Sequence, residues 1–166
     1  MLLTQQALEQ AQSQLGVQEE PRGSNSGPVV NEYLKAAGLR PGFAWCQALV
    51  YWCYQKAATL CAAVNPVVKT AGVLYCWNRT SEHRKIPRQD ALKNPALLQP
   101  GMQFILLFGR ATGHTGIVEK VDVKEGTYTT IEGNSNTDGS REGYEVVRHV
   151  RKLTDANLQG FINYAV

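Results

Sequence analysis

Cys46, His114 and the pair Glu132 and Asn134 are the residues whose types and order suit nucleophilic catalysis. A cysteine thiolate is a strong nucleophile, an imidazole exchanges protons near neutral pH, and a carboxylate or amide can orient that imidazole. A lone cysteine in a helix is more often a small core residue. The histidine and the Glu/Asn pair follow in the order that a cysteine catalytic set needs, so they favour acyl transfer by Cys46.

The stretch Pro41–Cys46 predicts the start of a helix, with Cys46 in the first turn. Apolar residues recur downstream at steps of three and four, the spacing of one buried helix face. They are Trp45, Cys46, Leu49, Val50, Cys53, Ala57, Leu60, Cys61 and Val64. Free backbone N–H groups and the helix dipole favour a thiolate at such a position.

A hairpin places the other candidate residues. The pattern predicts strands over residues 103–108, 115–123, 127–132, 145–150 and 160–166, separated by short turns. A three-residue loop at 124–126 would set Val118 opposite Glu132 and Gly116 opposite Asn134. His114, Glu132 and Asn134 then share one sheet face, with Asn134 diagonally next to the imidazole. A two-residue loop would put His114 on the other face.

Helices precede these strands. Residues 4–15 predict a helix with Thr4 as N-cap, and residues 29–37 predict another that follows Pro28 and ends before Gly38. The Gly/Ser/Pro-rich loop 16–28 is equally consistent with a functional loop and with a turn-rich connection. Residues 70–100 are expected to be irregular, and their basic cluster (His83, Arg84, Lys85, Arg88) fits a solvated surface best. The sequence thus predicts a single α+β domain over residues 1–166.

Composition narrows the function classes. A chain of 166 residues with a net charge of +3 lacks the basic stripe of a nucleic-acid binder. No apolar stretch is long enough to span a membrane, and the N-terminus carries no signal-peptide pattern. Synthesis and retention in the cytoplasm are therefore expected. The four cysteines lack the spacing of a zinc site and are expected to be free thiols, with a Cys61–Cys76 bridge as the alternative.

Several motifs resemble the CHAP domains, which belong to the NlpC/P60-like cysteine peptidases and amidases with a papain-like core. The motifs are residues 42–46, 113–118 and 131–134, with 23–28 and 139–144 as further matches. The resemblance implies a nucleophile helix packed on an antiparallel sheet, with Cys46 as nucleophile, His114 as base, and Glu132 with Asn134 as the orienting pair. It also implies that the Ser24-Asn25 loop borders the cleft, and the predicted substrate-binding residues are Ser24, Asn25 and Trp45.

The activity implied by the resemblance is cleavage of an amide bond in bacterial peptidoglycan, by an N-acetylmuramoyl-L-alanine amidase or a peptide endopeptidase. A protein of this kind without a signal peptide would be a phage lytic enzyme or an exported antibacterial effector, and an effector would need a cognate immunity protein. The alternatives are a noncatalytic wall-binding module and a cysteine acyltransferase or peptidase acting on another substrate.

Two departures from the family pattern stand out. Many CHAP domains carry Asp where this chain has Met102, a change remote from the proposed chemistry. Some relatives bind calcium through Asp residues just before the cysteine, but residues 39–44 offer no carboxylate. We therefore expect neither a metal nor any other cofactor.

Overall fold

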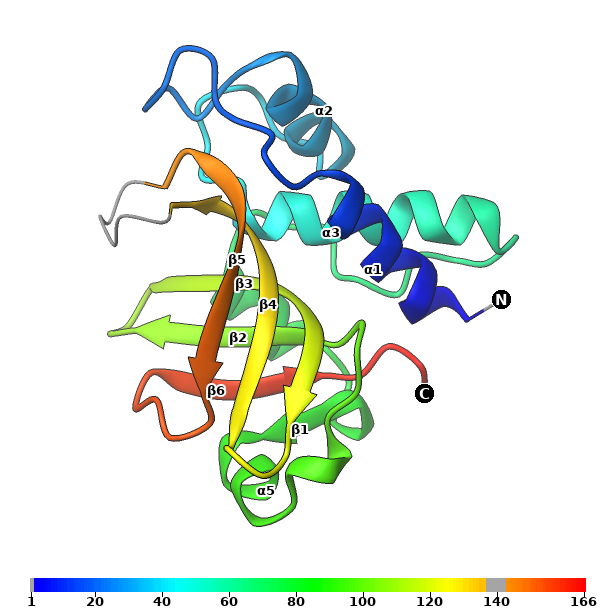
Figure 1. Ribbon diagram of the computed structural model, residues 1–166. Helices are drawn as coiled ribbons and strands as arrows, with labels where there is room; N and C mark the ends of the chain where they lie inside the picture. The colour runs from blue at the N-terminus through cyan, green and yellow to red at the C-terminus, as the bar shows by residue number, and fades with distance from the viewer. Residues whose placement is uncertain (1, 137–142) are drawn as a thin grey trace.

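A six-stranded antiparallel sheet organises the molecule, in the order β1-β6-β2-β3-β4-β5 (Figure 1). The computed structural model describes residues 2–136 and 143–166. The strands are β1 (Lys85–Pro87), β2 (Gln103–Phe108), β3 (Thr112–Asp122), β4 (Thr127–Ser135), β5 (Glu145–Lys152) and β6 (Leu158–Ile162). The part of the 139–144 motif that precedes residue 143 lies outside the described residues.

Helices α1, α2 and α3 lie together on one side of the sheet, and α5 lies at the far end of the molecule (Figure 1). The helices are α1 (Leu3–Ser13), α2 (Pro28–Ala36), α3 (Cys46–Leu60), α4 (Val73–Arg79) and α5 (Arg88–Lys93). With helices packed on an antiparallel sheet, the structure confirms the predicted α+β class and the predicted papain-like arrangement. Among the described residues, no helix has both the length and the apolar character needed to cross a membrane.

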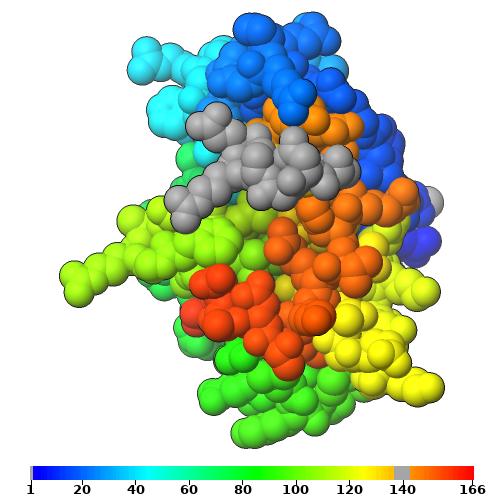
Figure 2. Space-filling view, turned by 60° about the vertical axis from the view of Figure 1, so that its left-hand side comes forward, coloured from blue at the N-terminus to red at the C-terminus, as the bar shows by residue number. Residues whose placement is uncertain are grey.

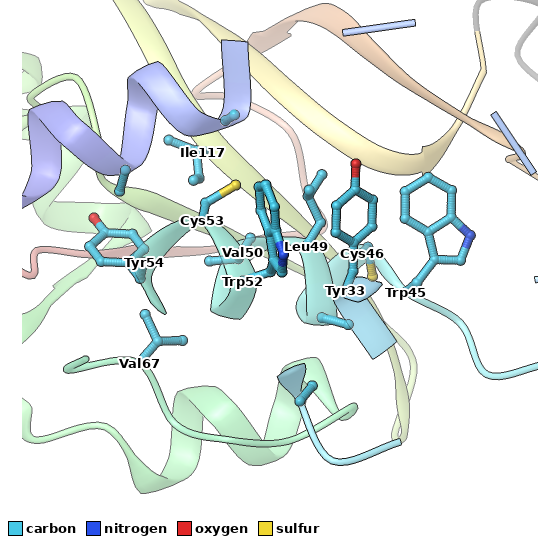
Figure 3. Packing of buried hydrophobic residues seen from close by; sticks show 14 of the residues in the cluster. Tyr33, Trp45, Cys46, Leu49, Val50, Trp52, Cys53, Tyr54, Val67 and Ile117 are labelled. Carbon is cyan, nitrogen blue, oxygen red and sulfur yellow. The ribbon is translucent and has the colours of Figure 1, made fainter. Parts of the chain in front are cut away.

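Helix α3 is the central packing element. Its residues 46–54 are buried, except for the half-buried Tyr51. Tyr33 of α2 packs its ring 5.8 Å from Trp45 and 5.1 Å from Trp52, measured between ring centroids. Figure 3 shows these three rings side by side along the helix, with Cys46 at the end near Trp45. Aromatic packing of this kind fixes the position of the helix start, and hence of Cys46.

The sheet has a core on each face. One cluster joins the helices to the sheet through Ile105, Ile117 and Ile131. The other cluster covers the opposite face and includes Phe104 and Tyr128. Since side chains alternate along a strand, His114 and Glu132 belong to the face of the second cluster, next to Phe104.

The structure corrects several predicted boundaries. Residue Leu2, not Thr4, stands at the N-cap of α1, and Thr4 is a buried helical residue. The stripe on α3 stops short, because Leu60 and Val64 are exposed. Residues 70–100 are not irregular: they form α4, β1, α5 and two short 3-10 helices (Glu82–Arg84 and Pro95–Leu97). Such short elements hold too few residues to show a period.

The N-terminal loop packs against the start of β5. Gln18 pairs with Glu145 in an isolated bridge, and the Glu19 N–H donates to the Tyr144 carbonyl at 2.8 Å. In Figure 2 the blue N-terminal residues and the orange residues of this strand lie side by side at the top of the molecule. The loop over residues 16–28 is thus tied to the sheet.

Candidate active site

Cys46 is the first residue of α3, as the sequence predicts. Trp45 occupies the N-cap position, makes no side-chain cap bond, and accepts the Leu49 N–H through its carbonyl at 2.9 Å. The first N–H groups of the helix, which begin at Cys46, therefore lack a partner within the helix. This end of the helix favours negative charge, on either a thiolate or an oxyanion.

The imidazole of His114 connects Cys46 to Glu132. Its Nε2 lies 2.7 Å from Glu132 Oε2, and the Cys46 thiol is also a hydrogen-bond partner of the ring. Because Nε2 faces Glu132, Nδ1 is the nitrogen left for the sulfur. The structure therefore brings Cys46, His114 and Glu132 together in one chain of contacts.

The predicted hairpin register is wrong, although it places the right residues on one face. Val118 pairs with Thr130 rather than Glu132, and Asp122 pairs with Thr127 across a four-residue loop. A bulge between Val118 and Lys120 adds a further residue to β3. The longer loop and the bulge each shift the pairing by one, and two shifts restore the original face.

Glu132 consequently takes the diagonal position beside His114 that was predicted for Asn134. Ile117 pairs with Ile131, so Glu132 follows alongside Gly116. Asn134 lies at a φ of 54°, where the pairing between β4 and β5 shifts. Its orienting role stays a prediction, and the contact with the imidazole belongs to Glu132.

Gly116 makes this approach possible. A Cβ placed there would press on the Ile131 carbonyl oxygen and lie 3.0 Å from Glu132 Cγ. We expect Gly116→Ala to lower the free energy of unfolding by about 1–3 kcal/mol, because the strands must separate to admit a methyl group. Urea unfolding measures this loss. Gly72→Ala, whose added Cβ meets only contacts of 3.4 Å or more, is the matched control; equal losses in both variants would contradict the argument.

The Glu132 carboxylate is buried and fully engaged. Arg151 Nε donates to Oε1 at 2.5 Å and Arg151 Nη2 to Oε2 at 2.7 Å. The Thr130 hydroxyl also donates to Oε1 at 2.5 Å. Burial raises the pKa of Glu132, but its hydrogen bonds with Arg151 and His114 outweigh burial and hold this pKa well below the usual range. Glu132 is therefore an anion at neutral pH.

His114 has the opposite shift. Burial lowers its pKa, but hydrogen bonds and charges from Cys46 and Glu132 prevail and raise the pKa to about 9. The imidazolium is therefore the favoured form at neutral pH. A positive ring between a sulfur and a carboxylate is the state in which a cysteine hydrolase stabilises its thiolate.

This shift predicts a pH dependence of stability. A histidine whose pKa rises on folding contributes stability that is fully present below its unfolded value near 6.5 and is lost as the pH rises through about 9. The difference in unfolding free energy between wild type and His114→Ala should therefore be constant below pH 6.5 and shrink toward pH 9. Urea titrations at several pH values measure it. A difference that does not change with pH would contradict the shift.

A buried polar network sets α3 against β3. Gln103 Nε2 donates to Gln47 Oε1 at 2.7 Å and to Thr115 Oγ1 at 2.9 Å. Gln47 directly follows Cys46, and Thr115 directly follows His114. Since buried amides must keep their partners, this network fixes the relative position of the nucleophile and the imidazole.

The predicted cleft residues are in two environments. Ser24 and Asn25 are half-buried in the N-terminal loop, and the Asn25 carbonyl accepts the Gly42 N–H at 2.9 Å, next to the approach to α3. Trp45 is fully buried, and its indole N–H donates to Glu19 Oε1 at 2.8 Å. Substrate contacts of these three residues stay predictions. Sequence reasoning missed Glu19, whose other carboxylate oxygen accepts the Gly23 N–H at 2.8 Å.

None of Cys46, Cys53, Cys61 and Cys76 forms a disulfide within the described residues, as predicted. Within residues 2–136 and 143–166, no group of three or more His, Cys, Asp or Glu side chains is placed to hold a metal ion. Activity without calcium stays a prediction, to be checked with a chelator.

Comparison with known proteins identifies a family for this chain. The family model described as CHAP domain matches residues 38–134, a range that contains Cys46, His114, Glu132 and Asn134. No curated protein and no solved structure matches the chain. The family match covers more than half of the 166 residues. The chain therefore belongs to the CHAP domain family, whose members are generally hydrolases of the peptidoglycan amidase and peptidase type.

Proposed function

We propose that this protein is a cysteine hydrolase that cleaves an amide bond in bacterial peptidoglycan. The observation that carries the proposal is the chain of contacts from Cys46, at the start of α3, through His114 to the buried carboxylate of Glu132. Membership of the CHAP domain family supports peptidoglycan as the substrate class. Peptidoglycan is thus the proposed partner.

The first half of the reaction forms an acyl-enzyme. The Cys46 thiolate attacks the carbonyl carbon of the amide, and a sulfur–carbon bond forms while the carbonyl oxygen becomes an oxyanion. The Cys46 N–H at the helix start is a donor for that oxyanion. The carbon–nitrogen bond then breaks, and the His114 imidazolium gives its proton to the leaving amine.

The second half regenerates the enzyme. The neutral imidazole takes a proton from water, the resulting hydroxide equivalent attacks the thioester, and the sulfur–carbon bond breaks to release a carboxylic acid. The imidazolium and the thiolate are restored, so protons and electrons balance over the cycle. Glu132 keeps the imidazole oriented through both halves, as the third member of other catalytic triads does.

We also propose which bonds the protein cuts and how it reaches the wall. The bond cut is either that between N-acetylmuramic acid and L-alanine or one within the stem peptides. The protein is made in the cytoplasm and reaches the wall after lysis, as a phage lytic enzyme, or through a secretion apparatus, as an antibacterial effector. In the effector case, the producing cell would carry an immunity protein that blocks the enzyme.

Release of soluble fragments from purified walls tests the proposal. Walls of several chemistries are incubated with wild-type protein and with protein alkylated by iodoacetamide, each with and without a calcium chelator. We expect release by the untreated protein only, and the same release with chelator. No release from any wall, combined with cosedimentation of the protein with walls, would favour a wall-binding module. Release by the alkylated protein would exclude the cysteine mechanism.

A further inference from the structure

We propose that Arg151, on β5, is a positioning residue that holds the Glu132 carboxylate in the plane and direction from which it contacts His114. This inference rests on the proposed function, because it concerns the same site. Arg151 lies outside the residues 38–134 that match the family. It therefore adds a component that the family match does not contain.

The geometry of the contact supports a positioning role. The guanidinium donates through Nε to Oε1 and through Nη2 to Oε2, at 2.5 and 2.7 Å. The same Oε2 lies 2.7 Å from His114 Nε2. A two-point contact between two planar groups fixes the rotation of the carboxylate, which a single hydrogen bond cannot do.

Burial makes the guanidinium necessary. The Glu132 side chain is 0% exposed and that of Arg151 is 22% exposed. A buried carboxylate that loses its cation either takes up a proton or turns toward another donor. His114 would lose its fixed acceptor in both cases.

The route of the Arg151 side chain indicates that the contact is specific. Arg151 pairs across the strands with Tyr128, whereas Glu132 pairs with Val147. The guanidinium must therefore run along the sheet face to reach the carboxylate. Its carbon lies 5.3 Å from the centre of the Phe104 ring, and that ring lies 6.1 Å from the imidazole. Phe104 thus packs against both groups and helps to hold them in place.

The other titratable groups around the contact are few. Glu132 forms hydrogen bonds with His114 on β3 and with Arg151 on β5. Cys46 on α3 forms a hydrogen bond with His114. Asp155 after β5 acts on Arg151 through its negative charge. Tyr128 on β4 is also near Arg151, but burial raises the pKa of its phenol, so it is neutral at neutral pH. Among these groups, Arg151 is the permanent cation in direct contact with Glu132. Its removal should therefore raise the pKa of Glu132.

A double-mutant cycle on the full chain tests the proposal without a wall substrate. The rate at which iodoacetamide alkylates Cys46 is followed by mass spectrometry of the Cys46 peptide. The proteins are wild type, Arg151→Gln, Glu132→Gln and the double variant. We expect each single variant to be slower by roughly tenfold, and the double variant to be no slower than the slower single variant, because both act through one contact.

Arg148 offers a matched control on the same strand. Its guanidinium makes a two-point contact with Glu119, at 2.7 and 2.9 Å, away from His114. Arg148→Gln should leave the alkylation rate unchanged. Carbon-13 NMR of the Glu132 carboxyl, assigned with Glu132→Gln, should show a raised pKa in Arg151→Gln and not in Arg148→Gln. A merely structural arginine would lower stability without the coupling in rate.

The outcomes separate this inference from the proposed function. A wild-type alkylation rate in Arg151→Gln, or additive losses in the cycle, would overturn the positioning role even if walls are cleaved. Coupled losses would support that role even if no wall is cleaved. If Arg151→Gln fails to fold by circular dichroism, Arg151→Lys replaces it. The lysine variant keeps the charge without the two-point contact, so a reduced rate supports the role and a wild-type rate overturns it.

Discussion

Alanine at Cys46 is expected to reduce wall hydrolysis by at least about a thousandfold, to below detection. No other group at the site can form the thioester, and the remaining oxyanion donor and binding contacts give little rate without a nucleophile. The fold should persist, because the change removes one sulfur atom at the start of a helix whose packing depends on Trp45 and Trp52. Release of fragments from purified walls and circular dichroism measure the two effects.

Cys53 supplies the control for this variant. It is buried in the same helix, and burial raises the pKa of its thiol, so it stays neutral at the pH of the assay. Cys53→Ala should lose about 1 kcal/mol of stability, as expected for a small buried group, and keep full activity. Full activity in Cys46→Ala, or loss in Cys53→Ala at equal folding, would contradict the assignment.

Alanine at His114 should have a comparably large effect, because the imidazole both stabilises the thiolate and protonates the leaving amine. Alkylation of Cys46 by iodoacetamide at neutral pH should slow as well, since the neighbouring positive charge is gone. The rates of wall hydrolysis and of alkylation are the two measurements.

His83 is the matched histidine control, since it is exposed in a short 3-10 helix that holds none of the proposed catalytic residues. His83→Ala should retain both rates. Retention of wall hydrolysis by His114→Ala would remove the general acid from the mechanism. Unchanged alkylation in that variant would show that the ring does not hold the sulfur as a thiolate.

The elements that carry the proposed catalytic residues were predictable because each has a local signature. The apolar period after Trp45 and the turn residues before it place Cys46 at a helix start, and α3 begins there. Alternation predicts five of the strands, and β2 has the predicted bounds of Gln103–Phe108. It misses β1, and β6 begins and ends earlier than the predicted residues 160–166. The contact between His114 and a residue of the Glu132/Asn134 pair followed from these two signals.

The register was not predictable by the same means. The loop at residues 123–126 is one residue longer than expected, and the bulge after Val118 has no local signature in the sequence. Only the parity of the shift determines which face a residue occupies, so two errors of one residue each left His114 and Glu132 facing each other. These two errors changed the neighbour of His114, however: Glu132 takes the diagonal position that was predicted for Asn134.

The groups that support the site were missed for a related reason. Arg151 lies 19 residues from Glu132 in the chain, and Glu19 lies 26 residues from Trp45. Their contacts depend on tertiary packing, and a charged residue on a strand or in a loop usually faces solvent. A buried carboxylate implies a nearby cation only once its burial is known.

Mass spectrometry of the fragments released from purified peptidoglycan by wild type and by Cys46→Ala is the most direct test of the proposed hydrolase. We predict new fragments from the wild type alone, because each cleaved amide leaves a new amine on one product and a new carboxylic acid on the other. Their masses would also distinguish an amidase from an endopeptidase. Identical fragments from both proteins, or none from either across several wall types, would contradict a wall hydrolase that uses Cys46.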